Sequence, residues 1–330
     1  MISEDQRLKS VDRPFTIVTD LLSFLELERS AAPYAVIENP GFSFFVSRSF
    51  AERMRKRNWF DPLLLQVLPR GEEAIERQGF VVDAVKDAVA QVVPGVLHKY
   101  NGRLLLLASG DCGVHCRFCF RRESPWRAHS SIKGGFADES ILYCGRTIDV
   151  REVILSGGDP LCLKPETFDR SLQQLAAIPH LRTIRIHTRL PVVEPYRIGH
   201  RIAGPLAALA EVKNCVIVIH ANHAAELTAD CSSALLLLRS AGILLLNQSV
   251  LLQGINDSVD SLADLSCALL DHGVVPYYLH QLDRVRGSWH FEVPVKTGRR
   301  IMRELRLRLP GYAVPRYVRE VPGEGSKTAL

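Results

Sequence analysis

Three cysteines lie close together in one short segment of the sequence. Cys112, Cys116 and Cys119 form a C-x3-C-x2-C pattern. Three thiolates at this spacing can bind three corners of a cubane iron–sulfur cluster and leave one iron without a protein ligand. The alternative is a structural zinc site with His115 or His129 as the fourth ligand. Zinc motifs usually come as two paired sets of ligands, however, and here there is one triplet, so the spacing favours the cluster.

The other five cysteines stand apart from one another. A chain of 330 residues with 8 cysteines is not a disulfide scaffold, and a reducing compartment would keep them as thiols. We interpret these five as small buried apolar residues: Cys144, Cys162, Cys215, Cys231 and Cys267.

The elements that must position these groups follow from hydrophobic periodicity. Short apolar runs alternate with longer amphipathic stretches, which indicates βα units and a parallel sheet. The expected strands are residues 103–108, 152–156, 183–187, 215–219, 243–248 and 275–280, and the helices between them include 165–178, 223–240 and 258–271.

Polar residues gather where each of the six expected strands ends. In parallel α/β barrels the loops after the strands build the active site. Six units are too few for a closed eightfold barrel, so we expect an open, partial (β/α)6 barrel over residues 96–290, whose gap something else must cover. Residues 1–95 read as a helical N-terminal region with helices at 18–29, 49–57, 62–67 and 82–90. Residues 291–330 form a C-terminal segment with a helix at 298–308 and an extended run at 312–321.

Composition excludes several classes of protein. Hydrophobic residues are 47% and charged residues 23%, as in ordinary globular proteins. The net charge of +5 comes from scattered residues, which gives no indication of nucleic-acid binding. The richest apolar stretch, 234–252, is interrupted by polar residues and is too short to span a membrane. Residues 1–14 lack the apolar run of a secretory signal, so we expect a cytoplasmic protein.

Several further motifs carry a family resemblance. Segments 98–100, 116–122, 155–161, 247–252, 276–280 and 311–315 occur in order before a C-terminal loop with Lys327. Together with the cysteine triplet they resemble the lysine 2,3-aminomutase family of radical S-adenosylmethionine (SAM) enzymes, from about residue 90 to 330. The short C-terminus and segments 63–69 and 93–95 are most similar to the branch that makes (R)-β-lysine for the modification of elongation factor P.

The resemblance implies a role for each matching residue near the cluster. The three cysteines would hold a [4Fe–4S] cluster whose open iron binds SAM. Gly157 and Gly158 would allow close approach of the methionine part of SAM, because a Cβ there would crowd it. Asp159 would receive its ammonium group, and Gln248 would lie near SAM. Without the resemblance, residues 157–160 would read as a plain tight turn.

The resemblance also implies pyridoxal 5′-phosphate (PLP), which supplies the π system for moving an amino group. Lys327 matches the family's PLP lysine, although on its own it would read as a solvated tail lysine. Tyr100 and Arg103 match PLP contacts, with Arg103 as a phosphate partner. Tyr100 could alternatively pack at a strand entrance.

For a lysine substrate the family pattern supplies ions of both signs. Arg121 would pair with the α-carboxylate, whereas Arg122 reads as a solvated or structural arginine. Asp283 and Glu320 would bind the ε-ammonium, and Glu320 stands where the family has Asp. Alternatively, Glu320 is an exposed acid among neighbouring arginines.

The resemblance therefore implies an isomerase that converts L-lysine to (R)-β-lysine and needs an external electron donor, with a functional link to elongation factor P and its lysyl ligase. The rival interpretations are an aminomutase for arginine or glutamate, and a non-catalytic zinc or iron–sulfur module. The family's interface zinc uses a cysteine where this chain has Ser258, so we expect no structural zinc and leave the oligomeric state open.

Overall fold

The computed structural model describes residues 13–38, 41–124 and 136–330. His129, one of the two candidate zinc ligands, lies outside these residues. No helix in the described ranges is long and apolar enough to cross a membrane.

A ten-stranded sheet with strands in chain order forms the centre of the molecule. Strands β3 to β9 run parallel, while β1 and β2 at one edge and β10 at the other pair antiparallel. The strands are β1 (Gln91–Val93), β2 (Val96–Tyr100), β3 (Arg103–Ser109), β4 (Glu152–Gly157), β5 (Thr183–Thr188), β6 (Asn214–His220), β7 (Leu244–Leu251), β8 (Val275–Gln281), β9 (Arg316–Arg319) and β10 (Thr328–Ala329). All six expected strands are confirmed, and their ends differ from the prediction by at most three residues.

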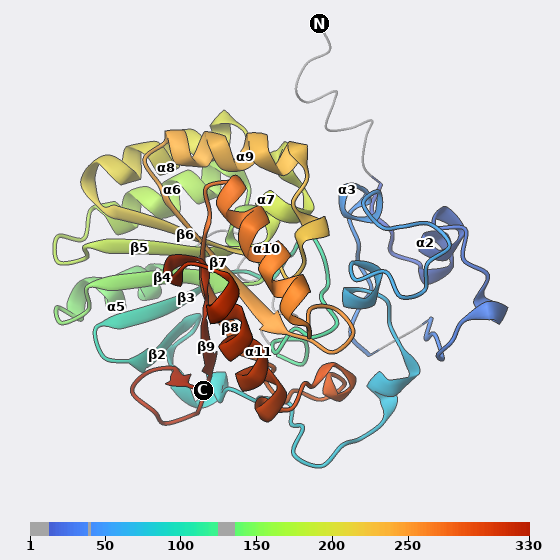
Figure 1. The fold of residues 1–330 in the computed structure, drawn as a ribbon. Coiled ribbons are helices and arrows are strands. Elements are labelled where there is room, and N and C mark those ends of the chain that lie inside the picture. Colours follow the sequence, from blue (N-terminus) through green and yellow to red (C-terminus); the bar gives the residue numbers. More distant parts are fainter. Residues whose placement is uncertain (1–12, 39–40, 125–135) are drawn as a thin grey trace, which may run out of the picture.

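Helices cover the outer face of the sheet (Figure 1). They are α5 (Asp138–Arg146), α6 (Pro165–Ala176), α7 (Leu190–Val193), α8 (His200–Val212), α9 (Ala229–Ser240), α10 (Val259–Asp271) and α11 (Val295–Arg308). The Ser258 hydroxyl caps α10 by accepting a hydrogen bond from the Ser261 amide. The expected helix 223–240 divides into a 3₁₀ turn, η8 (Ala224–Glu226), and α9. Apolar side chains of the strands and helices form one large core between the two layers.

The sheet curls until its two flanks meet. The Tyr100 hydroxyl, at the end of β2, donates a hydrogen bond of 2.5 Å to Oε1 of Glu320, which follows β9. Figure 1 shows the red C-terminal segment beside β2. Because the sheet ends in β1 and β10, which are not paired with each other, the prediction of an open, partial barrel is confirmed.

The N-terminal region lies beside the barrel, in blue in Figure 1. It contains α2 (Val18–Phe24), α3 (Arg48–Ala51), α4 (Asp87–Ala90) and the 3₁₀ turns η1 (Arg29–Ala31), η2 (Leu64–Gln66) and η3 (Gly71–Ala74). These helices are shorter than predicted, and β1 joins the sheet although residues up to 95 were expected to be helical. Such short helices have little stability of their own. Helices α2 and α3 and the turn η2 are held by an apolar core that includes Phe50, Leu64 and Trp59.

The remaining 3₁₀ turns lie in the barrel and in the C-terminal segment. They are η6 (Pro160–Cys162), η7 (Pro195–Arg197), η9 (Trp289–Phe291) and η10 (Gly311–Ala313). Only residues 316–319 of the expected extended run 312–321 form a strand, β9, and η10 occupies the start of that run. The helix predicted at 298–308 is confirmed and begins three residues earlier.

Candidate active site at the strand ends

The loop with Cys112, Cys116 and Cys119, here called the cysteine loop, follows β3. Its backbone is hydrogen-bonded to the N-terminal region. The His115 amide donates to the carbonyl of Phe45 at 2.9 Å, and the Arg117 amide donates to the carbonyl of Gln66 at 2.8 Å. The loop is thus fixed from outside the barrel by segments far away in sequence.

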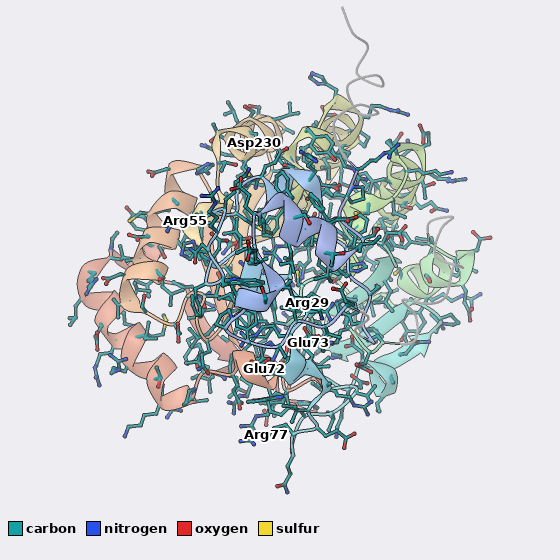
Figure 2. The ribbon with its side chains drawn as sticks, turned by 90° about the vertical axis from the view of Figure 1, so that its right-hand side faces the viewer. Arg29, Arg55, Glu72, Glu73, Arg77 and Asp230 are labelled. Atoms are coloured by element: carbon teal, nitrogen blue, oxygen red, sulfur yellow. The ribbon has the colours of Figure 1, made fainter. Side chains whose placement is uncertain are left out.

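A buried group of charged side chains also holds the cysteine loop against the N-terminal region. Arg117 is fully buried, and its Nε donates to Oε1 of Glu73 at 2.9 Å while its Nη2 donates to Oε2 at 2.5 Å. Nη2 of Arg122 donates to the same Oε2 at 2.6 Å. Burial alone would raise the pKa of Glu73, but the two arginines outweigh it and lower that pKa. In Figure 2 Glu73 lies in the N-terminal region, in front of the barrel. Arg122 is therefore structural, one of the two roles predicted for it, and not solvated.

The donor set fits a cluster better than a single metal ion. Within the described ranges no three His, Cys, Asp or Glu side chains converge as the ligands of one ion would. In a cubane each thiolate binds a different iron, so the three sulfurs surround the cluster at larger separations than the ligands of one ion would have. His115 packs against the rings of Phe42 and Phe45 and hydrogen-bonds the Ser43 carbonyl at 3.0 Å, which argues against its use as a zinc ligand.

An arginine is directed at one of the three thiols. Nη1 of Arg189, after β5, lies 2.6 Å from Sγ of Cys116. Burial raises the pKa of Cys116, and the guanidinium opposes this shift. A neighbouring cation stabilises the thiolate, the form that binds metal.

Gly157 and Gly158 permit a close contact between two loops. Gly157 has φ +109°, and a Cβ on Gly158 would lie 2.3 Å from the backbone oxygen of Asp111 in the cysteine loop. The Gly158 amide donates to the carbonyl of Ser109 at 2.6 Å. The sequence prediction attributed these glycines to SAM, whereas the structure supplies another reason, the approach of the cysteine loop itself.

Asp159 ties two strand ends together. Its Oδ1 accepts hydrogen bonds from the Leu161 amide at 3.0 Å and the Thr188 hydroxyl at 2.7 Å, and its Oδ2 accepts from the amides of Arg189 at 2.7 Å and Leu190 at 3.0 Å. A carboxylate has about four acceptor positions, so this side chain is saturated. These contacts position the turn after β5, and the role of Asp159 as acceptor of the SAM ammonium stays a prediction.

Arg121 is buried at the mouth of the barrel. Its Nε donates to Oδ2 of Asp87 at 3.0 Å, and its Nη1 donates to the Ser156 hydroxyl at 2.9 Å. Nζ of Lys99 lies 2.6 Å from Oδ1 of the same Asp87. Burial alone would raise the pKa of Asp87, but Arg121 and Lys99 lower it. Asp87 was missed by the sequence analysis, because it lies in a segment with no motif.

Lys327 is brought to this mouth by the last strand. Since Thr328 pairs with Arg319, the residues that precede β10 and follow β9 face each other. Nζ of Lys327 donates to Oε2 of Glu320 at 2.7 Å. The Glu320 side chain is only 10% exposed, so its interpretation as an exposed surface acid is wrong. A substrate ammonium group could pair with the Glu320 carboxylate only after Lys327 has left it.

Arg103 accompanies Tyr100 at this flank of the sheet. The two residues pair in the β2–β3 hairpin, and the guanidinium carbon lies 5.0 Å from the centre of the tyrosine ring. Burial, followed by the hydrogen bond to Glu320, raises the pKa of Tyr100. Tyr100 thus makes a polar contact with Glu320 and does not only pack at a strand entrance.

Asp283 lies just beyond β8 and is half-buried. Burial raises its pKa to about 7, and the nearby charges of Lys327 and Glu320 act in opposite directions on it. An acid with this pKa binds a proton or a cation readily at neutral pH.

Gln248 lies in β7, paired with His220 on one side and Tyr278 on the other. Burial lowers the pKa of His220 to about 3 and that of His187 well below its usual value. Both Nε2 atoms are buried without a hydrogen-bond partner among the described residues. Neutral imidazoles with spare hydrogen-bonding capacity in a barrel interior suit a polar ligand.

No protein-family model matches the chain. The curated relatives include L-lysine 2,3-aminomutases of three bacteria. The Escherichia coli (strain K12) protein is 45% identical over 289 residues, which are 88% of this chain and 83% of the relative. The Buchnera aphidicola protein is 42% identical, with 87% and 83% covered, and the Haemophilus influenzae protein is 39% identical, with 93% and 90% covered. At this identity and coverage, the chain belongs to the L-lysine 2,3-aminomutase family, whose reaction is an isomerisation.

Proposed function

We propose that this protein moves the amino group of L-lysine from C2 to C3, using a [4Fe–4S] cluster, SAM and PLP. The observation that carries the proposal is the convergence of Lys327, Glu320, Asp283 and Arg121 on one mouth of the barrel. The cysteine loop follows β3 at the same end of the sheet.

When bound, the cluster and SAM supply a radical that can remove a substrate hydrogen, and PLP supplies a π system for the migrating nitrogen. Cys112, Cys116 and Cys119 would hold the cluster. Lys327 would hold the aldehyde of PLP, with Tyr100 beside it and Arg103 as the partner of the phosphate.

Two residues would orient the substrate. Arg121 offers a planar guanidinium to the α-carboxylate, and Asp87 and Ser156 hold that guanidinium in place. Asp283 would bind the ε-ammonium, with Glu320 as a second acid once Lys327 has left it. Two acids at this mouth favour a lysine or arginine side chain over glutamate.

SAM would lie between the cysteine loop and the ends of β6 and β7. Gly157 and Gly158 let the turn after β4 pack against the cysteine loop, and together with Gln248 they would contact SAM. Asp159 would contribute by fixing the turn after β5.

The product and its use come from the branch resemblance. Segments 63–69 and 93–95 support (R)-β-lysine as the product, made in the cytoplasm for the ligase that modifies elongation factor P. The electron would come from an external donor.

The test is an anaerobic assay of the reconstituted protein. Lysine, arginine and glutamate are incubated separately with SAM, PLP and dithionite, and products are separated on a chiral column. We expect (R)-β-lysine from lysine alone. Turnover of arginine or glutamate in place of lysine would redirect the proposal to that amino acid. A protein that assembles no cluster would refute it.

A further inference from the structure

A continuous set of buried polar side chains leads from the N-terminal region to the cysteine loop. The Gln66 side-chain amide contacts Glu226 at 3.0 Å through its Nε2 and Arg189 at 2.6 Å through its Oε1. Nη2 of Arg189 donates to Oε2 of Glu226 at 2.8 Å. Nη1 of the same guanidinium donates to Sγ of Cys116 at 2.6 Å.

Glu226 cannot relax away from this arrangement. It is fully buried, and its Oε1 accepts hydrogen bonds from the backbone amides of Asn222 at 2.8 Å and His223 at 3.1 Å. Burial alone would raise the pKa of Glu226, but Arg189 and the hydrogen bonds from Gln66 and the Asn222 amide lower it. The carboxylate therefore stays ionised and fixed in place.

Arg189 is consequently shared between a carboxylate and a cysteine sulfur. Its planar fork has one nitrogen on a carboxylate and another on a cysteine sulfur, and its guanidinium carbon lies 5.3 Å from the centre of the Phe50 ring. A charge-assisted hydrogen bond in a buried site is stronger than its solvent-exposed counterpart. Hydrogen bonds to cysteine sulfurs and the net charge nearby set the reduction potential of an iron–sulfur cluster.

We propose that Arg189 raises the reduction potential of the cluster held by Cys116, and that Glu226 moderates this effect. Reduction adds negative charge to the cluster, so a guanidinium on its sulfur ligand favours the reduced form and the Glu226 carboxylate disfavours it. The inference rests on the proposed cluster. Arg189 and Glu226 are positioning residues, since they act through the sulfur of Cys116.

The test is a redox titration monitored by electron paramagnetic resonance, with titanium(III) citrate as reductant and no SAM or lysine present. We expect Arg189→Gln to lower the potential and Glu226→Gln to raise it. A tenfold change in the ratio of oxidised to reduced cluster corresponds to about 59 mV for one electron, and we expect at least this change for Arg189→Gln. Arg189→Lys, which keeps the charge, should shift the potential less.

The opposite signs separate tuning from a structural role, because damage to the fold would not move two potentials in opposite directions. Arg201→Gln is the matched control, since it removes an exposed arginine that pairs with Glu166 on the outside of the barrel, and it should leave the potential unchanged. If Arg189→Gln does not fold, Glu226→Gln and Arg189→Lys decide the question. Unchanged potentials, or shifts of one sign, overturn the inference. Failure of the unmodified protein to assemble a cluster would instead overturn the proposed function.

Discussion

Lys327 and Glu320 form an ion pair across the turn that joins the last two strands, with Nζ 2.7 Å from Oε2. The pairing of Thr328 with Arg319 sets this contact, because it places the flanking residues opposite each other. Glu320 also accepts the Tyr100 hydroxyl, so the lysine is anchored to both flanks of the open barrel. A lysine near the end of the chain is thereby held at the mouth of the barrel.

This anchoring predicts where PLP attaches. After incubation with PLP and reduction by borohydride, the peptide that contains Lys327 should carry the label, and Lys327→Ala should lose it. The matched control is Lys296→Ala, which removes an exposed lysine of α11 and should label like the unmodified protein. Label that persists in Lys327→Ala would move the PLP site to another lysine.

The raised pKa of Asp283 predicts that lysine binding depends on pH. Its pKa of about 7 means that it is largely protonated below pH 7, whereas an ammonium binds the ionised form. The dissociation constant of lysine, measured by equilibrium dialysis on PLP-loaded protein without SAM, should fall as the pH rises toward about 7 and then level off. The limiting slope is about tenfold per pH unit. Asp283→Asn should bind lysine weakly and without this step.

The same raised pKa predicts an effect on stability that needs no ligand. The folded protein binds the Asp283 proton more tightly than the unfolded chain does, so this residue contributes destabilisation that grows as the pH rises from about 4 to about 7. In urea titrations, Asp283→Asn should match the unmodified protein near pH 4 and exceed it at pH 8 by more than about 1 kcal/mol, since one pKa unit is about 1.4 kcal/mol. An equal difference at both pH values would contradict the assignment.

The barrel could be predicted from the sequence because it depends on local periodicity. Each strand from β3 to β8 is a short apolar run, and each carries its polar residues at its end. The cysteine triplet is also local. Asp87 and Arg189 were harder to identify, since their partners Arg121 and Cys116 lie 34 and 73 residues away.

Two side chains show why the sequence did not reveal all the contacts of the candidate residues. Asp159 was assigned to a ligand, but the turn after β5 uses all its acceptor positions, and nothing in residues 155–161 indicates that turn. Glu320 was weighed between substrate and solvent, but its partner is Lys327. Sequence reasoning identified charged groups, whereas their pairing depends on strand register.

Gly158 predicts a coupling between the two loops at the ends of β3 and β4. A Cβ in Gly158→Ala would meet the Asp111 backbone oxygen at 2.3 Å and force the cysteine loop to move. We expect the iron and sulfide content after reconstitution to fall several-fold. Gly204→Ala, in helix α8 with no atom within 4 Å of the new Cβ, is the control and should keep its full iron content. Full iron content in Gly158→Ala would show that the loops can separate without cost.

The hydrogen bonds of Glu73 predict that its removal weakens the contact between the N-terminal region and the cysteine loop. Its carboxylate accepts hydrogen bonds from both Arg117 and Arg122, so Glu73→Ala leaves two buried guanidinium groups without their anion. Removal of one partner from a buried ion pair costs about 3–5 kcal/mol. We expect a loss of this size in the free energy of unfolding measured with urea, together with reduced cluster content.

Glu76→Ala is the control for this measurement. Glu76 lies three residues further along the chain and is exposed, so the substitution should change the free energy of unfolding by less than about 0.5 kcal/mol. Glu73→Gln keeps the shape and one acceptor oxygen, and it should therefore lose less stability than Glu73→Ala. If Glu73→Ala unfolds like Glu76→Ala, the arginines find other anions or water, and the backbone hydrogen bonds from the loop to the carbonyls of Phe45 and Gln66 are enough to hold the loop.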